Sequence, residues 1–349
     1  MAPLFQQPFM SGGFPSMNRA GGAVGGWVEL GRTTLGSAGT NIDVSSIPDK
    51  RYYMILSNTY AGGSPDIRLR LGNSTIDTGS NYASRWSENG SSDSTQTSAS
   101  NLIYDSVGNI FTDKFNVGYI ANVSSKEKLI LNHSVDGDAG GASVASKRSE
   151  FAGKWTNTSN PLDILRVYGT SNLSTGSELV VLGWDPADTH TNNFWEELAS
   201  VTADGTSTDM SSGTITAKKY LWIQLYQKGR AGDVRLRFNS DSGSNYTRRY
   251  SQNGGVEGTD TSVAHISNMI GYGSTPSFGN AFIINNQSNE KLIMGHHILQ
   301  NTGGAGTIQD RMEFVGKWAN TSNQITNVNI LSSSGNFPSG SILKVWGAD

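Results

Sequence analysis

The segment Asp66-Ile-Arg-Leu-Arg-Leu71 returns later in the chain as Asp233-Val-Arg-Leu-Arg-Phe238. In each copy the apolar side chains occupy every second position after the aspartate, and arginines occupy the positions between them. Because successive side chains of a β-strand point to opposite faces, this period of two predicts a strand with an apolar face and an arginine face. The pair of segments therefore predicts strands packed on a core, and it predicts that the core occurs twice.

The same order of segments occurs twice between Trp27 and the end of the chain. Self-similarity at near-constant spacing over so long a stretch indicates a tandem duplication. A polar run that begins near Pro186 interrupts the pattern and indicates a linker. We therefore predict two domains of one fold, at residues 27–185 and 194–349, joined by residues 186–193. The matching segments are 27–30 and 195–198, 79–82 and 243–246, 127–130 and 290–293, and 150–160 and 313–323.

The composition favours strands over helices. The chain of 349 residues contains 42 glycines, long runs of Ser, Thr and Asn, and only 16% charged residues. Short apolar runs separated by Gly, Asn and Ser turns are typical of antiparallel sandwiches. The sequence predicts an all-β protein with two tandem antiparallel β-sandwich domains of jelly-roll type and an extended N-terminal arm. At most one short helix is expected, within residues 194–200 or 101–110.

The cysteine and charge content exclude several classes of function. The chain has no cysteine, which excludes disulfides, thiolate metal sites and a cysteine nucleophile. The formal net charge is −3 with both signs dispersed, so no basic stripe exists for a nucleic acid. No segment approaches the ~18 apolar residues of a membrane span, and the first 26 residues lack the features of a signal peptide. We expect no nucleic acid or membrane as a partner, and synthesis in the cytoplasm.

Residues 1–26 form a segment of different composition, rich in Gly, Pro and Met with isolated aromatic residues at Phe5, Phe9 and Phe14. The segment has no period that would fold it alone. One interpretation is a disordered tail. The other is an arm that becomes ordered on a neighbouring subunit, with the three phenylalanines as anchors.

Arginine and aromatic residues recur together in both copies. Arg68, Arg70 and Arg85 with Tyr82 in the first copy correspond to a second set in the other copy. Arginine combines planar, bidentate hydrogen bonding with stacking on rings, which suits a protein interface or an acidic glycan. The alternative is a solvated sheet face crossed by internal salt bridges. The second set is Arg235, Arg237, Arg249 and Tyr246.

Histidines and acids offer weaker signals for metal binding. His296 and His297 are adjacent, but the first copy has only His133 at this place, so polar strand residues are the preferred interpretation. The segment from Asp136 to Asp138 begins like a calcium loop, yet it lacks the distal glutamate at the required spacing and is interpreted as an ordinary loop. We predict no metal and no cofactor.

Catalytic motifs are also missing from the sequence. No nucleophile elbow, phosphate loop or dinucleotide fingerprint occurs. The acids that recur in both copies each lie beside Arg or Lys in strands, so ion pairing explains them more simply than a glycosidase pair would. We therefore predict no catalytic residues and no enzyme. Trp155 and Trp318, in the shared Gly-Lys-Trp segment, are expected in or near the core.

The segment 325–347, Ile-Thr-Asn-Val-Asn-Ile-Leu-Ser-Ser-Ser-Gly-Asn-Phe-Pro-Ser-Gly-Ser-Ile-Leu-Lys-Val-Trp-Gly, resembles the closing part of β-sandwich modules in structural proteins of tailed bacteriophages. The Arg-Leu-Arg-Phe, Gly-Ser-Asn-Tyr and Tyr-Ser-Gln-Asn-Gly-Gly segments of the second copy resemble the same modules. The similarity covers most of residues 27–349 and is more faithful in the second copy, because the first has Tyr-Gly-Thr-Ser-Asn-Leu at 168–173 in place of the Ser-Gly-Asn-Phe turn.

This resemblance implies a component of the virion, such as a capsid decoration protein or a part of the tail, collar or fibre. It implies other virion proteins as partners and a homo-oligomer, and it carries no catalytic residue over. A receptor-binding or glycan-binding protein of the tail or fibre is the alternative that the sequence leaves open.

Overall fold

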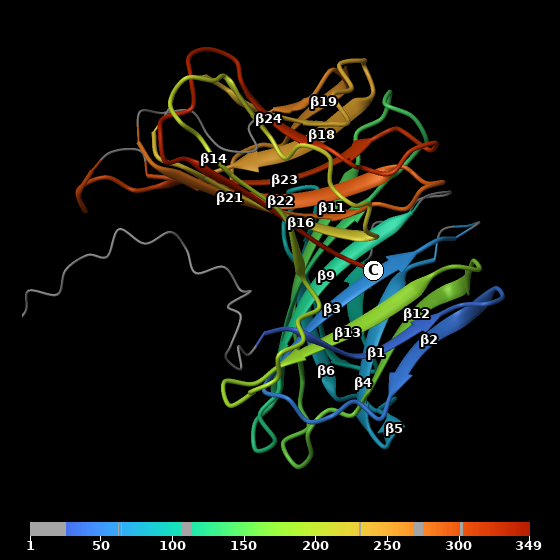
Figure 1. Cartoon of the computed structure of the whole chain (residues 1–349). Coiled ribbons are helices and arrows are strands. Elements are labelled where there is room, and N and C mark those ends of the chain that lie inside the picture. Colours follow the sequence, from blue (N-terminus) through green and yellow to red (C-terminus); the bar gives the residue numbers. More distant parts are fainter. Residues whose placement is uncertain are drawn as a thin grey trace, which may run out of the picture.

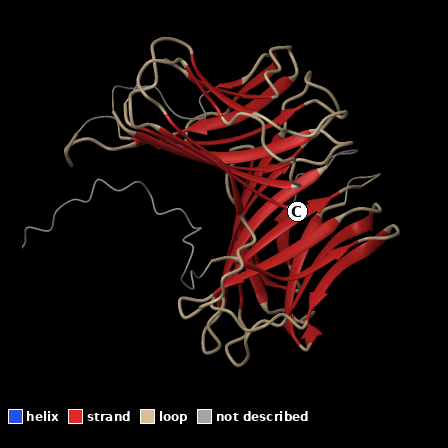
Figure 2. Ribbon diagram, in the orientation of Figure 1, coloured by secondary structure: helices blue, strands red, loops and turns tan. Residues whose placement is uncertain are grey.

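The computed structural model describes residues 26–61, 63, 65–105, 113–229, 232–267, 275–300 and 303–349. Phe5, Phe9 and Phe14, the expected anchors of the arm, lie outside these residues. All regular elements in the described part of the chain are strands, so the predicted all-β fold is confirmed. In Figure 2, where helices would be blue and strands are red, the described residues contain no blue ribbon.

Domain 1 is a sandwich of two antiparallel sheets. The larger has eight strands in the order β1-β13-β3-β9-β10-β11-β6-β7, and the smaller contains β2-β12-β4-β5 with β8 paired to β4. The strands are β1 (Val28–Thr34), β2 (Gly39–Ser45), β3 (Tyr52–Thr59), β4 (Ile67–Asn73), β5 (Thr75–Ile76), β6 (Tyr82–Glu88), β7 (Ser94–Ala99), β8 (Leu102–Asp105), β9 (Lys114–Ala121), β10 (Lys128–Asp136), β11 (Lys147–Trp155), β12 (Ile164–Leu173) and β13 (Glu178–Trp184).

Domain 2 repeats this arrangement. Its larger sheet has the order β14-β25-β16-β21-β22-β23-β18-β19 and its smaller sheet the order β15-β24-β17-β20, which confirms the predicted tandem duplication. The strands are β14 (Glu196–Thr202), β15 (Asp209–Ser211), β16 (Tyr220–Gln227), β17 (Val234–Phe238), β18 (Tyr246–Gln252), β19 (Gly258–Val263), β20 (Ile266–Ser267), β21 (Ser277–Ile284), β22 (Lys291–Leu299), β23 (Asp310–Trp318), β24 (Val328–Ser332) and β25 (Ile342–Ala348).

Each sandwich has its own core between its two sheets. In β4 the residues Ile67, Leu69 and Leu71 are fully buried, while the arginines between them lie on the outer face, as the period of two predicts. Trp155 and its counterpart Trp318 are also in the cores, as expected, and each indole N–H donates a hydrogen bond to an aspartate in a neighbouring turn.

The expectation of a short helix at 194–200 or 101–110 was wrong for the described residues, which form β14 and β8 there. A β-bulge between Glu197 and Ala199 shifts the pairing of β14 with β25. Leu198 and Val201 therefore both pack toward the core at a spacing of three, which imitates a helical period. Residues 106–110 lie outside the described part.

A third apolar core joins the two domains. The outer faces of the two eight-stranded sheets meet there, with β10 beside β22 and β11 beside β23. Figure 1 shows domain 2, in yellow to red, above domain 1, in blue to green, with β11, β22 and β23 near the junction. Domain 1 contributes Met54, Leu56, Phe115, Val117, Val135, Val180 and Leu182, and domain 2 contributes Trp195, Tyr220, Phe282, Ile284, Leu292, Met294, Val315, Trp346 and Ala348.

Candidate functional site

The junction contains a buried polar anchor beside its apolar core. The ring of Phe115 lies 6.1 Å from that of Tyr220, and the Tyr220 hydroxyl donates a hydrogen bond of 2.7 Å to Glu178. Lys219 forms an ion pair of 2.8 Å with the same carboxylate. Burial acts to raise the pKa of Glu178, but the hydrogen bonds from Lys219, Thr34 and Tyr220 outweigh it and the net pKa is lowered. Glu178 is thus held ionised at the contact between the domains.

Arg148 on β11 is the centre of a second polar contact across the junction. The residue is buried, and its guanidinium pairs with Glu150 of its own strand at 2.9 Å. The same guanidinium pairs with Glu257 at 2.8 Å and Glu313 at 3.1 Å, both from domain 2. A buried arginine needs such carboxylate partners, because removing a charge from water is costly unless it is paired. The network therefore joins the domains in one defined orientation.

His133 on β10 and His296 on β22 face each other at the edge of the junction, with ring centroids 4.2 Å apart. Glu150 lies 3.9 Å from the Nε2 of His133. Burial, together with the nearby Arg148, lowers the pKa of His133 to about 4. Burial, the neighbouring His133 and Arg148 lower the pKa of His296 to about 3. Both rings are therefore neutral at physiological pH.

Neutral imidazoles and a carboxylate are also the ligands of many transition-metal sites. The ligand atoms of His133, Glu150 and His296 lie within 4.8 Å of one another, which is close enough for three ligands of one ion after a small movement. Arg148 already donates to Glu150, however, so an ion bound there would have to take this carboxylate from the guanidinium. The other two carboxylates around Arg148, those of Glu257 and Glu313, would then neutralise its charge.

This arrangement differs from the pair considered in the sequence. His297 is buried and points to the opposite face of β22 from His296, because successive strand residues alternate. The partner of His296 is instead its own counterpart, His133, in the other domain. The available signal was that these were the only histidines at equivalent positions in the two copies.

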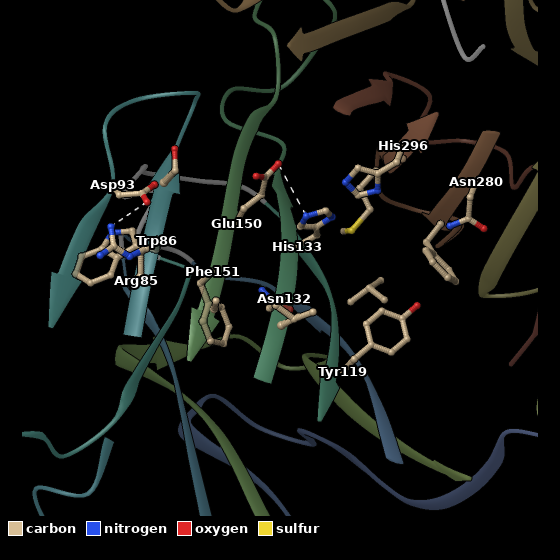
Figure 3. Close-up of a pocket in the computed structure, with 17 residues that line it drawn as sticks. Arg85, Trp86, Asp93, Tyr119, Asn132, His133, Glu150, Phe151, Asn280 and His296 are labelled. Carbon is tan, nitrogen blue, oxygen red and sulfur yellow. Dashed lines mark hydrogen bonds and ion pairs between the residues drawn. The ribbon is translucent and has the colours of Figure 1, made fainter. Parts of the chain in front are cut away.

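An open cleft of about 440 Å³ begins at the histidine pair and runs along the face of domain 1. Figure 3 shows Arg85, Trp86 and Asp93 on the left, Glu150 and His133 in the middle, His296 on the right and Tyr119 below. Asn280 and Phe282 line it from domain 2. The cleft combines aromatic rings with charged and amide groups.

A second hollow of about 630 Å³ continues from the cleft over the uncovered half of the large sheet of domain 1. Here apolar side chains are accessible: Tyr52 is 37% exposed, Tyr119 39%, Leu129 58% and Leu131 62%. Trp27 and Trp184 complete the group, and Tyr52 stacks on Trp184 with ring centroids 5.5 Å apart. We call these six residues the open patch.

The arginines that the sequence singled out do not form one face. Arg68 and Arg70 lie on the outer face of the small sheet, where Arg68 pairs with Asp66 at 2.6 Å and Arg70 lies 4.7 Å above the ring of Tyr168. Arg235 pairs with Asp233 at 3.2 Å, and Arg237 donates to the carbonyl of Ala264. Arg68 and Arg235 thus form internal salt bridges, as in the alternative interpretation, whereas Arg70 contacts an aromatic ring and Arg237 a backbone carbonyl.

Arg85 and Arg249 lie elsewhere, on the large sheets. Arg85 borders the cleft, and it is exposed and pairs with Asp93 at 3.1 Å. Arg249 pairs with Glu257 at 2.9 Å and donates to the carbonyl of Ser146 in domain 1. Arg249 is therefore a contact residue, but its partner is the other domain of the same chain.

The prediction that Tyr82 and Tyr246 belong to an accessible binding face was wrong. Both are buried, with 1% and 0% of the surface exposed. The Tyr82 hydroxyl accepts a hydrogen bond from the N–H of Leu71 at 3.1 Å and donates to the carbonyl oxygens of Leu71, in β4, and of Asp77, which follows β5. Tyr246 makes the same contacts with Phe238 and Asp241. Alternation places each ring inward at the first residue of its strand, so these tyrosines fasten a turn to the core.

The acids of the loop from Asp136 to Asp138 form ion pairs with lysines. Asp136 pairs with Lys114 at 3.3 Å and Asp138 with Lys147 at 3.1 Å. The carbonyl of Gly137 accepts a hydrogen bond of 2.9 Å from the buried Lys317 of domain 2. The loop is thus a further part of the junction.

No described residues form a helix that is both long and apolar enough to cross a membrane. No protein-family model matches the chain, and no curated protein matches it. Among solved structures, it is similar to domains LG4-5 of the mouse laminin alpha1 chain, at 9% identity and a TM-score of 0.20 over 97% of this chain and 93% of that one. A structure described as "Unveiling the Mechanism Behind the in-meso Crystallization of Membrane Proteins" matches at 11% identity and a TM-score of 0.12, over 76% of this chain and 82% of that one.

Proposed function

We propose that this chain is a non-enzymatic structural protein of a bacteriophage particle, a capsid decoration protein or another particle-attached protein that binds neighbouring subunits. It would be made in the cytoplasm of the host and become part of the virion, with other virion proteins as partners. The observation that carries the proposal is the open patch. Contiguous accessible apolar side chains on a rigid sheet are typical of protein interaction sites.

Leaving the apolar side chains of this patch in water is unfavourable. Burying a side chain such as Leu131 contributes on the order of 1.5–3 kcal/mol, and Leu129, Tyr52 and Tyr119 are exposed beside it. Tyr52, Tyr119, Leu129 and Leu131 lie on strands that are paired on both sides, so binding requires little ordering of this backbone. A partner that covers the patch therefore gains free energy from apolar burial without the further cost of ordering this backbone.

The proposal is tested by incorporation into particles. The full chain and the variant Leu131→Asp are supplied to particles that lack the protein, and occupancy is measured by electron microscopy and gel densitometry. We expect the variant to lose most of its occupancy, because a carboxylate would have to be buried. Val256→Asp is the matched control, since Val256 is 98% exposed and lies outside the patch. Equal occupancy for all three proteins, or none for any, would contradict the proposal.

A second candidate function, a receptor-binding or glycan-binding protein of the tail or fibre, is favoured by the cleft. Aromatic rings beside carboxylate, guanidinium and amide groups provide the stacking and hydrogen bonding that sugars require, and Trp86, Asp93, Arg85 and Asn280 all line this space.

A glycan array distinguishes the two functions. If the second holds, the full chain binds defined glycans, and Asp93→Asn with Arg85→Ala weakens that binding at least tenfold, because exposed hydrogen-bonding groups are lost. Arg68→Ala, on the small sheet, is the control. An array without specific binding, or binding that the double variant retains, would rule out this function for the cleft.

A further inference from the structure

The contact between the two domains is unsymmetrical although the domains are copies. Phe115 of domain 1 packs against Tyr220 of domain 2. The counterparts are fixed by strand register: Phe115 pairs with Val135 as Phe278 pairs with Ile298, and Tyr52 pairs with Ala121 as Tyr220 pairs with Ile284. Their counterparts Phe278 and Tyr52 are 41% and 37% exposed and lie outside the buried junction core, so the reciprocal half of the contact is not buried. The two copies thus use different halves of the same sheet face.

The open patch of domain 1 is the counterpart of the half that domain 2 buries. Leu129 and Leu131 are 58% and 62% exposed, whereas the equivalent residues Leu292 and Met294 are 0% and 3% exposed beneath domain 1. The aromatic residues also correspond. Tyr52 and Tyr119 match Tyr220 and Phe282, and Trp27 matches Trp195. Domain 1 therefore exposes the counterpart of a surface that, in domain 2, binds the other sandwich of this chain.

Domain 2 carries the opposite half uncovered. Phe278 is 41% exposed and Ile298 is 46% exposed, whereas their counterparts Phe115 and Val135 in domain 1 are 1% and 0% exposed inside the junction. We call Phe278, Ile298 and the neighbouring Arg311 the free end. The free end thus has an aromatic, an aliphatic and a cationic residue, as does the part of domain 1 that contacts domain 2 in the junction.

Charge complementarity supports the same pairing. Inside the junction Arg148 reaches Glu257 and Glu313 of the other domain. The equivalent arginine, Arg311, pairs with Glu313 of its own strand as Arg148 pairs with Glu150, but its side chain remains 60% exposed. The counterparts of the two glutamates are Asp93, which pairs with Arg85 as Glu257 pairs with Arg249, and Glu150. Both border the open patch through the cleft.

We propose that the open patch binds the free end of a second copy of this chain, in a repeat of the junction between the two domains. Phe278 and Ile298 of one copy then pack on Tyr52 and Leu131 of the next, and Arg311 lies beside Asp93 and Glu150. This proposal rests on the proposed function, for which it names the partner. A heterologous contact of this kind leaves a patch and a free end at the two ends, so copies add head to tail into a ring or a filament.

The experiment measures the mass of the full chain in solution by light scattering and analytical ultracentrifugation. We expect an oligomer for the unaltered chain and a single chain for each of Leu131→Asp and Ile298→Asp. An equimolar mixture of these two variants has one intact patch and one intact free end, so it should form a dimer and nothing larger. Val256→Asp is again the control and should keep the full oligomer.

Other results would overturn the proposal. If the unaltered chain is monomeric at all concentrations, the proposal is wrong. If that monomer still enters particles, the proposed function stands and only the identification of the partner as a second copy fails. An oligomer that Leu131→Asp abolishes and Ile298→Asp leaves intact would indicate a symmetrical patch-to-patch contact. If deletion of residues 1–25 removes the oligomer while Ile298→Asp does not, the covering segment is the N-terminal arm of a neighbour. Oligomers without particle binding would contradict the proposed function instead.

Discussion

The histidine pair is the residue-level feature with the clearest measurable consequence. His133 and His296 have pKa values of about 4 and about 3 in the folded chain, because burial and nearby cations disfavour the charged ring. A histidine in an unfolded chain has a pKa near ~6.5. Below that pH the unfolded state binds protons that the folded state does not, so acidification favours unfolding.

We therefore predict that stability falls as the pH decreases from about 6.5 towards 4, before most carboxylates titrate. The groups that face the pair include Glu150, Arg148 and Arg311. In the double variant His133→Gln with His296→Gln, the decrease over this range should be smaller. Urea unfolding at a series of pH values measures it, and identical slopes for the two proteins would disprove the assignment.

At the level of single elements, the tyrosine at the start of β6 and of β18 holds the preceding turn. The hydroxyl of Tyr246 accepts a hydrogen bond of 3.0 Å from the N–H of Phe238, and the aspartate of the same turn accepts one from Trp318. An identical set surrounds Tyr82. The repetition shows that the turn requires these bonds in both copies.

We predict that Tyr246→Phe lowers the free energy of unfolding by about 1–2 kcal/mol, because the buried N–H of Phe238 loses its acceptor. The urea midpoint by tryptophan fluorescence measures the change. Tyr226→Phe, on the outward face of β16, is the matched control and should change it little. An unchanged midpoint for Tyr246→Phe would show that the turn is held by the tryptophan contact alone.

For the whole molecule, the sequence was sufficient for the fold and insufficient for the site. Alternation in segments such as 66–71 determines which side chains point inward, and the duplicated order determines that two such bodies exist. Neither pattern predicts which outer sheet face of domain 1 contacts which outer sheet face of domain 2. The contact of His133 with His296 and the burial of Arg148 arise from packing between the domains, for which the chain has no local period.

The tyrosines show a related limit. Tyr82 recurs beside the arginines in the sequence, but it lies three residues before Arg85 in β6 and therefore on the opposite face, and a turn separates it from Arg68 and Arg70. The β-bulge in β14 had the same effect on a smaller scale, since one extra residue changed the apparent spacing of Leu198 and Val201.

The unsymmetrical junction also gives the molecule a direction, from the end with Trp27 to the end with Phe278. A ring built by repeating this junction has two unlike sides, because rotation about its axis never exchanges top and bottom. Such a ring would lie on a particle in one orientation only, so the same loops would always face outward.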